Sequence, residues 1–423
     1  SMGRDSLYYN TTGSSNTAIG RSAMQGPGSG QCTGSNNTAV GRGALFGNTS
    51  GQQNVAVGRA ALDANTTGSY NIGIGQDALG ANTTASHNVA VGTSSLIHNT
   101  TGGENTALGH AALLNNTASN NVAVGYSSLV ANTSGTNNTA VGTYSLDANT
   151  TGSNNTAFGY SALSSITAGT ACVAVGYDTL KNNTANNNTG VGFKALIATT
   201  TGDDNTALGS QALETNTTGE YNTAIGHQAL EANTTANDNV AVGYHALKAN
   251  TTGTNLVAVG AKALDSNTTG NGNIAIGKEA LQTNTTASHN TAIGQGALYF
   301  NTSGTRNTAV GANGPLTANT TGNDNTAFGY AAGALNTTAS GNTAVGSSAL
   351  YNTTTGNYNT GVGQTALGSN STGTQNTAVG YNSLYSNQGG MNNTAVGFYA
   401  LLNSTGGGNV AVGSFCLDAN TSG

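Results

Sequence analysis

The sequence contains no tryptophan, only two prolines and three cysteines, and charged residues make up just 6% of it. Globular domains carry roughly a quarter charged residues, so this surface must consist mainly of neutral side chains. Disordered chains combine low hydrophobicity with high net charge, whereas here 36% of residues are hydrophobic and the formal charge is −6. No apolar run approaches the ~18 residues of a membrane helix, and we expect no membrane insertion.

The scarcity of basic residues and cysteines excludes further classes of protein. Ten Lys and Arg residues spread along 423 positions are too sparse for the basic stripe that nucleic acids require, so no nucleic-acid partner is expected. Cys32, Cys172 and Cys416 lie far apart and fit neither a disulfide framework nor a metal motif. Cys172 and Cys416 replace residues of a repeat and are interpreted as packing substitutions.

One repeat accounts for nearly all of the chain. The phrase Asn-Thr-Ala-Val-Gly recurs 24 times, mostly at a spacing of 17 residues, from the copy that ends at Gly20 to the copy that ends at Gly413. The consensus, numbered 1 to 17, is Asn-Thr-Ala-Val-Gly-x-x-Ala-Leu-x-x-Asn-Thr-Thr-Gly-x-x. A short fixed period of this kind is typical of a stacked solenoid. Glycines and Asn within each unit leave no room for a helix but admit two short extended segments.

The predicted fold class is therefore all-β, a β-solenoid of about 24 coils. Residues 1–15, which begin with the tag-like Ser-Met-Gly, are predicted to be a tag remnant and lead-in, and residues 16–423 the repeat array. The last residues stop within a repeat, so we expect the chain to be a segment of a longer protein. Near Pro315 and Gly333 the core leucine shifts to Leu316 and Leu335, which predicts a local disturbance of the register.

The residues allowed at each position predict which side chains are buried. Position 4 is always apolar, position 9 is Leu in nearly every copy, and the Asn and Thr of positions 12 and 13 should stack into ladders between coils. Position 3 is Ala, or Gly at Gly73, Gly190 and Gly361. Because position 3 points away from positions 2 and 4, we expect position 4 to lie in the coil's own core and position 3 to face neighbouring chains.

An alternative orientation remains open. A very thin solenoid with room only for Ala inside would place the Val and Ile row of position 4 on the outside, as an apolar strip along the chain. Either orientation favours an oligomer, and three identical chains around a common axis would bury the strip. We therefore expect a homotrimer.

The repeat also resembles known arrays. Asn239-Val-Ala-Val-Gly243 and Asn273-Ile-Ala-Ile-Gly277 resemble the head repeat of trimeric autotransporter adhesins, and Asn205-Thr-Ala-Leu-Gly209 with Asn216-Thr-Thr-Gly219 is similar to arrays of phage tail-fibre-like proteins. This resemblance implies a left-handed β-roll that assembles as a trimer and is located outside the cell, on a virion tail fibre or a cell surface.

No enzyme, metal site or cofactor is expected from the sequence. The histidines occupy variable positions, the acidic residues are scattered, and no carboxylate pair is set to raise a pKa for acid–base catalysis. Position 6 hints at recognition, because it is aromatic in several copies. The candidate receptor contacts, for a host-surface glycan or protein, are Tyr126, Tyr160, Tyr177, Phe193 and Tyr244. Three of these fall on consecutive copies and would stack, which is also what rings that merely cover the coil edge would do.

Two classes of function remain. The first is a structural and attachment fibre, a rigid trimeric β-rod of a phage tail fibre or a cell-surface adhesin. The second is an ice-binding solenoid, since low charge and regular Thr rows suit a flat ice-facing surface. Against ice binding, the adjacent threonines at positions 13 and 14, such as Thr217 and Thr218, point to opposite faces and form no two-abreast array.

Overall fold

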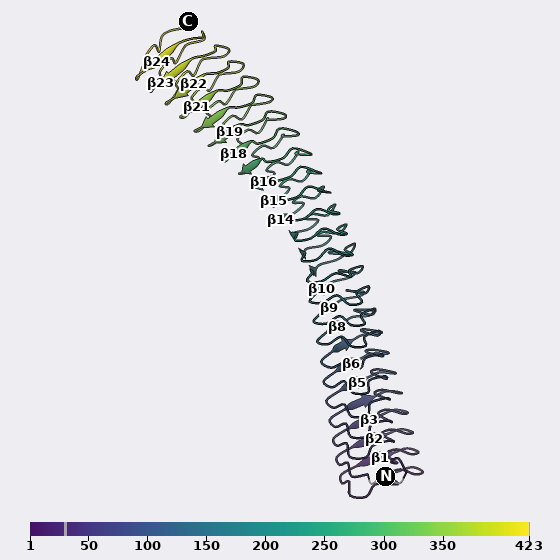
Figure 1. Cartoon of the computed structure of the whole chain (residues 1–423). Helices are drawn as coiled ribbons and strands as arrows, with labels where there is room; N and C mark the ends of the chain where they lie inside the picture. Colours follow the sequence, from purple (N-terminus) through teal and green to yellow (C-terminus); the bar gives the residue numbers. More distant parts are fainter. Residues whose placement is uncertain (29–31, 423) are drawn as a thin grey trace. The chain divides into compact units, whose positions relative to one another are not determined.

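The computed structural model describes residues 1–28 and 32–422, which are all-β and contain no helix. Its contacts divide the chain into unit 1, Ser1–Ala207, and unit 2, Leu208–Gly423, and each is a stack of coils with one three-residue strand per coil (Figure 1). The strands are β1 Thr17–Ile19, β2 Thr38–Val40, β3 Val55–Val57, β4 Ile72–Ile74, β5 Val89–Val91, β6 Thr106–Leu108, β7 Val122–Val124, β8 Thr139–Val141, β9 Thr156–Phe158, β10 Val173–Val175, β11 Thr189–Val191, β12 Thr206–Leu208, β13 Thr223–Ile225, β14 Val240–Val242, β15 Val257–Val259, β16 Ile274–Ile276, β17 Thr291–Ile293, β18 Thr308–Val310, β19 Thr326–Phe328, β20 Thr343–Val345, β21 Thr360–Val362, β22 Thr377–Val379, β23 Thr394–Val396 and β24 Val410–Val412.

Successive strands within each unit pair in parallel, with equivalent repeat positions opposite each other. Ala56 of β3 lies opposite Gly73 of β4 in unit 1, and Ala224 of β13 lies opposite Ala241 of β14 in unit 2. This register places each coil one strand spacing, ~4.8 Å, above the previous coil. The β-solenoid predicted from the 17-residue period is confirmed.

The interior of each coil is formed by positions 3, 8 and 9. Ala241, Ala246 and Leu247, which occupy these positions in one coil, are 0% exposed within a single chain. A Cβ placed on Gly73 would lie 3.3 Å from Leu62 Cγ of the preceding coil and 3.1 Å from the Ala78 carbonyl oxygen. The core is therefore so thin at position 3 that only Ala or Gly fits.

This packing corrects the expected orientation of the strand. Position 3 faces the chain's own core, not a neighbouring chain, and position 4 lies outside, half-buried or exposed. Phe158 and Phe328, the largest residues at position 4, are 56% and 57% exposed. The thin solenoid with an external apolar strip, the alternative left open by the sequence, is the observed arrangement.

Buried asparagines replace much of the hydrophobic core of an ordinary protein. At position 12, Asn65 Nδ2 donates to Asn48 Oδ1 of the preceding coil at 3.0 Å and to the Gly68 carbonyl at 3.0 Å. At position 1, Asn54 Oδ1 accepts the backbone amide of Asn71 in the next coil at 2.9 Å. These contacts satisfy polar groups that are 0% exposed, as burial demands. The predicted position-12 ladder is confirmed.

The threonines of position 13 add a second ladder, also as predicted. Thr49 Oγ1 donates to the Thr66 carbonyl at 2.9 Å, and Thr66 Oγ1 donates to the Thr83 carbonyl at 3.0 Å. Each hydroxyl therefore links its coil to the next.

The glycine of position 5 is required by its backbone geometry. Gly243 has φ +135°, and a Cβ there would lie 2.7 Å from the Gly260 carbonyl carbon of the next coil. No L-residue with a side chain fits a position that is both left-handed and this close to another backbone. The invariance of this glycine within the repeat thus follows from stacking.

The register near Pro315 differs from the expectation. Leu316 keeps its place in the leucine ladder, since its amide donates to the Ala332 carbonyl at 3.0 Å and it is 2% exposed. Leu335 leaves the core and is 40% exposed. The core position of that coil is taken by Gly333, whose amide donates to the Ala349 carbonyl at 2.9 Å. The expected slip therefore occurs at Leu335 alone.

The lead-in residues stack on the first repeat. Met2 forms a parallel bridge with Ile19, and its amide donates to the Ala18 carbonyl at 2.9 Å. The Leu7 amide donates to the Ala23 carbonyl at 3.1 Å, and Asn10 Nδ2 donates to the Gly13 carbonyl at 2.9 Å, as position 12 does in later coils. Residues 2–13 thus have the backbone of a coil.

Candidate functional site

A ladder of aromatic rings runs along one surface row of unit 1. Tyr160 stacks on Tyr177 with ring centroids 5.3 Å apart, and Tyr177 stacks on Phe193 at 5.7 Å. The stacking expected for these three residues is confirmed, and it continues toward the N-terminus through Tyr144 and Tyr126. The complete aromatic ladder occupies six consecutive coils and consists of His110, Tyr126, Tyr144, Tyr160, Tyr177 and Phe193.

Two members of this ladder were not anticipated from the sequence. His110 stacks on Tyr126 at 5.2 Å, although the sequence suggested only a solvated loop histidine. Tyr144 stands at position 7, not 6, yet its ring packs edge-on against Tyr126 at 5.5 Å and Tyr160 at 6.2 Å. Aromatic residues at either position of successive copies are the signal that would have found both.

The geometry of the ladder limits what it can bind. A nucleobase inserted between two rings needs two stacking separations, about 7 Å in total, whereas Tyr160 and Tyr177 are 5.3 Å apart. The faces that Tyr160 and Tyr177 turn toward each other are therefore covered, while about half of each side chain, 45% for Tyr160 and 49% for Tyr177, stays exposed. Ring edges and Tyr hydroxyls are thus the groups available to a ligand.

Tyr244, the fifth candidate, belongs to a separate cluster in unit 2. Its ring stacks on His245 with centroids 3.7 Å apart and on His227 at 5.7 Å. The pKa of His245 is lowered, mainly because burial penalises the imidazolium and secondarily because Lys248 is close. The structure therefore divides the five candidate residues between two places, four in the aromatic ladder and Tyr244 apart from them.

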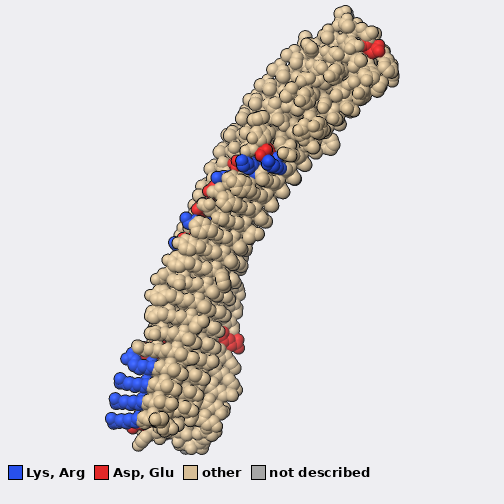
Figure 2. All heavy atoms as spheres, turned by 180° about the vertical axis from the view of Figure 1, so that it is seen from behind, with Lys and Arg blue, Asp and Glu red and all other residues tan. Residues whose placement is uncertain are grey.

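Basic side chains gather on the first coils of unit 1. Position 6 is occupied by Arg4, Arg21, Arg42 and Arg59 in four successive coils, and Figure 2 shows basic side chains side by side at that end of the unit. The expectation that the ten basic residues form no stripe is wrong for this segment. The parallel register brings four residues that are distant in sequence into one line, here called the Arg row.

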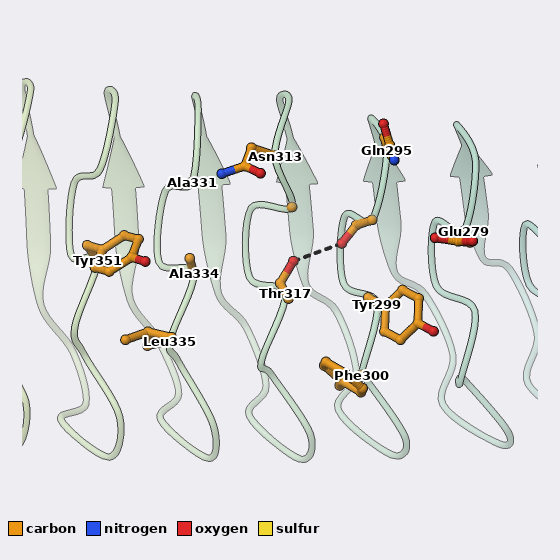
Figure 3. Close-up of a pocket in the computed structure, with 12 residues that line it drawn as sticks. Glu279, Gln295, Tyr299, Phe300, Asn313, Thr317, Ala331, Ala334, Leu335 and Tyr351 are labelled. Atoms are coloured by element: carbon orange, nitrogen blue, oxygen red, sulfur yellow. Dashed lines mark hydrogen bonds between the residues drawn. The ribbon is translucent and has the colours of Figure 1, made fainter.

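A hollow of about 740 Å³ lies in unit 2 beside the irregular coil. Its apolar lining comes from Tyr299, Phe300, Leu335 and Tyr351 (Figure 3). Thr317 Oγ1 donates to the Gly296 carbonyl at 3.0 Å and ties two coils together across its floor. The extra residue between Gly311 and Pro315, together with the displaced Leu335, opens this space in an otherwise regular surface.

The polar side chains that line the hollow include one carboxylate and two amides. Glu279 is the sole carboxylate among the described residues that line it, and it forms an ion pair with Lys278 at 3.4 Å. Gln295 and Asn313 supply neutral amides.

Outward-facing side chains at positions 2 and 4, here called the strand face, form an apolar strip on each unit. In unit 1 Leu108 is 47% exposed, and in unit 2 Ile276 is 39% exposed. Single exposed apolar residues are ordinary, whereas exposed apolar residues repeated along successive coils are unusual on a monomeric protein.

Half-buried carboxyls occur at position 10 of three coils. Burial raises the pKa of Asp63, Asp147 and Asp265, and the charge of Asp77 raises that of Asp63 further. For Asp63 the neighbouring carboxylate contributes less to the raised pKa than burial does. Asp147 and Asp265 lie on distant coils, and each is a single half-buried acid.

No three His, Cys, Asp or Glu side chains within residues 1–28 and 32–422 converge as metal ligands would. Within the same ranges, no helix has the length and apolarity to cross a bilayer.

Comparison with known proteins places the chain in no family. No protein-family model matches it, and the search of curated proteins finds no significant relative.

Proposed function

We propose that this chain is the shaft of an extracellular attachment fibre, of the type found in phage tail fibres and cell-surface adhesins, and that its copies associate as a homotrimer. The β-solenoid itself supports a structural role, because each coil is tied to the next by backbone, Asn and Thr hydrogen bonds. Stacked repeats of this kind leave few strand edges open.

The strand face is the observation that carries the proposed assembly. Phe158 and Phe328 stand out from it with more than half of their surface exposed. Burying such rings against another chain stabilises association by roughly 25 cal/mol per Å² of apolar surface. The surface that meets the partner is thus the Val and Ile row of position 4, with position 2 beside it.

The experiment compares the mass of the wild-type chain with that of a charged variant. Val242→Lys/Val259→Lys puts two ammonium groups on the strand face, while Thr252→Lys/Thr269→Lys adds the same charge at exposed positions on another side of the coils. Sedimentation equilibrium should give a trimer for wild type and the Thr variant, and a monomer for the Val variant. A monomeric wild type, or a trimeric Val variant, would refute the assembly.

The aromatic ladder is the proposed receptor contact of the fibre. Its exposed ring edges and Tyr hydroxyls suit a surface glycan or protein better than a flat stacking ligand. Tyr160→Gln/Tyr177→Gln should abolish adhesion to receptor-bearing cells while leaving the trimer mass unchanged. Adhesion at the wild-type level would remove the ladder from the proposal.

A second candidate function, ice binding, is favoured by one observation in unit 2. From β17 to β23, every strand presents Thr at position 2 beside an apolar residue at position 4, which gives one outward row of threonines next to one apolar row. These threonines are Thr291, Thr308, Thr326, Thr343, Thr360, Thr377 and Thr394. Phe328 breaks the flatness of this array, so the fibre is preferred. An ice-recrystallisation assay tests the alternative directly.

A further inference from the structure

The Arg row is held in line by the backbone, not by chance side-chain positions. Each arginine carbonyl accepts a hydrogen bond from the amide of position 7 in the next coil. These bonds run from Ser22 to Arg4 at 2.9 Å, from Gly43 to Arg21 at 3.0 Å, from Ala60 to Arg42 at 2.9 Å and from Asp77 to Arg59 at 2.9 Å. Successive guanidinium groups therefore start from backbone positions one coil apart, ~4.8 Å.

The two central arginines carry uncompensated charge. At the ends of the row, Arg4 pairs with Asp5 at 3.3 Å and Arg59 with Asp77 at 3.6 Å. Arg21 and Arg42 are exposed, and no described carboxylate lies within 4.0 Å of them. Like charges directly opposite each other on neighbouring strands destabilise a sheet, so the free chain gains no stability from this arrangement.

Several basic residues elsewhere form ion pairs with carboxylates. Lys181 pairs with Asp178 at 3.1 Å, and Lys248 pairs with Glu231 at 3.4 Å. Both are single charges beside a carboxylate. The next coil after Arg59 carries the neutral Gln76 at position 6, so the fold itself does not demand arginine there. Four arginines in register are best explained by a ligand that neutralises them.

We propose that the Arg row binds a linear acidic polysaccharide with one carboxylate per sugar unit, aligned along the stack of coils. A carboxylate accepts two parallel hydrogen bonds from one guanidinium, which gives the pair both geometry and strength. Because successive units of an extended 1,4-linked chain turn their carboxylates to alternate sides, a chain lying along the row presents one carboxylate to every second arginine, about two coil spacings apart. This site is independent of the strand face and of the proposed trimer.

Other polyanions fit this row less well. Duplex DNA places one phosphate every ~3.4 Å along the axis on each strand, and each strand winds away from a straight row. Single-stranded nucleic acids bind through bases stacked on open aromatic faces, whereas the faces of Tyr160 and Tyr177 cover each other. An anionic membrane attracts clustered basic residues without regard to their spacing, so it leaves the even alignment of the row unexplained.

The surface beyond the row can continue the contact. Position 6 runs on through Gln76 and Thr93 to His110, where the aromatic ladder of the same unit begins. The amide and hydroxyl can hydrogen-bond sugar hydroxyls, and the ring edges beyond them can contact the sugar backbone. A polysaccharide longer than the row would thus follow position 6 along unit 1.

The test measures binding of an oligo-mannuronate to the full chain by isothermal titration calorimetry, with a neutral maltooligosaccharide of equal length as comparator. Wild type should bind the acidic oligosaccharide only, and more weakly as salt is added. Arg21→Gln/Arg42→Gln should weaken binding at least tenfold. Gln occurs naturally at this position in the next coil, so the variant should fold, and a melting curve checks this.

The matched control removes the same charge elsewhere. Lys181→Gln/Lys248→Gln lowers the net charge equally but should leave the affinity for oligo-mannuronate unchanged. An equal loss in both variants would overturn the proposal, because binding would then follow net charge alone. Absence of binding by wild type, or tighter binding of oligo-thymidylate or of phosphatidylserine vesicles than of oligo-mannuronate, would overturn it as well.

Discussion

Asn233 donates a hydrogen bond from Nδ2 to Asn216 Oδ1 of the preceding coil at 2.9 Å, and a second one to the Ala236 carbonyl of its own coil at 3.1 Å. In turn, Asn233 Oδ1 accepts from Asn250 Nδ2 at 3.2 Å. One side chain therefore joins three coils through groups that are 0% exposed. Hydrogen bonds between buried asparagine side chains therefore stabilise the interior of this solenoid together with the buried leucines.

Removing one asparagine from this ladder of hydrogen bonds should lower the stability of the fold. We expect Asn233→Ala to lower the free energy of unfolding by ~1–3 kcal/mol, because buried donors and acceptors of both neighbouring coils lose a partner. Thr252→Ala, at an exposed position, is the control and should change stability little. Chemical denaturation measures both. Equal stability of Asn233→Ala and wild type would show that the ladder contributes nothing.

Enlarging position 3 should disrupt the single chain, not only its assembly. Ala224→Gln/Ala241→Gln places long side chains where both residues are 0% exposed. Overpacking costs ~1–3 kcal/mol per site, and an unpaired amide adds ~1–3 kcal/mol. Thermal melting of dilute, dissociated protein should show the loss.

The neighbouring outward positions provide a matched control for that variant. Ile225→Gln/Val242→Gln changes the strand face, so we expect the stability of the single chain to change little while self-association weakens. The opposite result would contradict the structure. If Ala224→Gln/Ala241→Gln weakened only self-association while Ile225→Gln/Val242→Gln destabilised the single chain, position 3 would face outward.

Restoring the asparagine ladder at its one cysteine should stabilise the fold. Cys172 takes the place of position-1 Asn: its amide donates to Asn155 Oδ1 at 3.0 Å, but it offers the Asn188 amide only sulfur. A sulfur is a weaker acceptor than an amide oxygen. Cys172→Asn should therefore raise the free energy of unfolding by about 1 kcal/mol, seen as a higher melting temperature. A lower melting temperature would mean that the cavity is shaped for the thiol.

The half-buried position-10 carboxyls predict an unusual pH dependence. Burial raises the pKa of Asp147 in the folded chain, so the folded state binds more protons than the unfolded state just above the ordinary Asp pKa of ~3.9. Stability then falls as pH rises through the raised pKa. We expect the melting temperature to increase on acidification from pH ~7 toward ~4.5, and Asp147→Asn to reduce that increase.

Two groups contribute in the opposite sense. The lowered pKa of His245 reduces stability as pH falls through the ordinary His pKa of ~6.5, so the effect of Asp147 is the difference between wild type and Asp147→Asn. The guanidinium of Arg306 lowers the pKa of Asp324 through a side-chain hydrogen bond, so that pair loses its stabilising effect as pH falls below the ordinary Asp pKa. If wild type and Asp147→Asn changed their melting temperatures equally between pH ~7 and ~4.5, the prediction for Asp147 would be contradicted.

Much of the architecture was evident in the sequence. The 17-residue period, the glycine of position 5, the leucine of position 9 and the Asn of position 12 each repeat so regularly that parallel stacking of equivalent positions is the economical explanation. Leu213, in the middle of the array, is 0% exposed as its position predicts. Periodicity alone determined these features because identical coils stack only in register.

Only the tertiary structure decided which side of the strand faces inward. A row of Ala and Gly suits a close approach by another chain as well as a thin core, and residue type cannot separate the two. The leucine of the preceding coil, 3.3 Å from where a Cβ on Gly73 would lie, settles the matter. The Arg row and the aromatic ladder likewise emerge only in three dimensions, because residues some 17 positions apart become neighbours when the backbone carbonyl of one coil accepts the amide of the next.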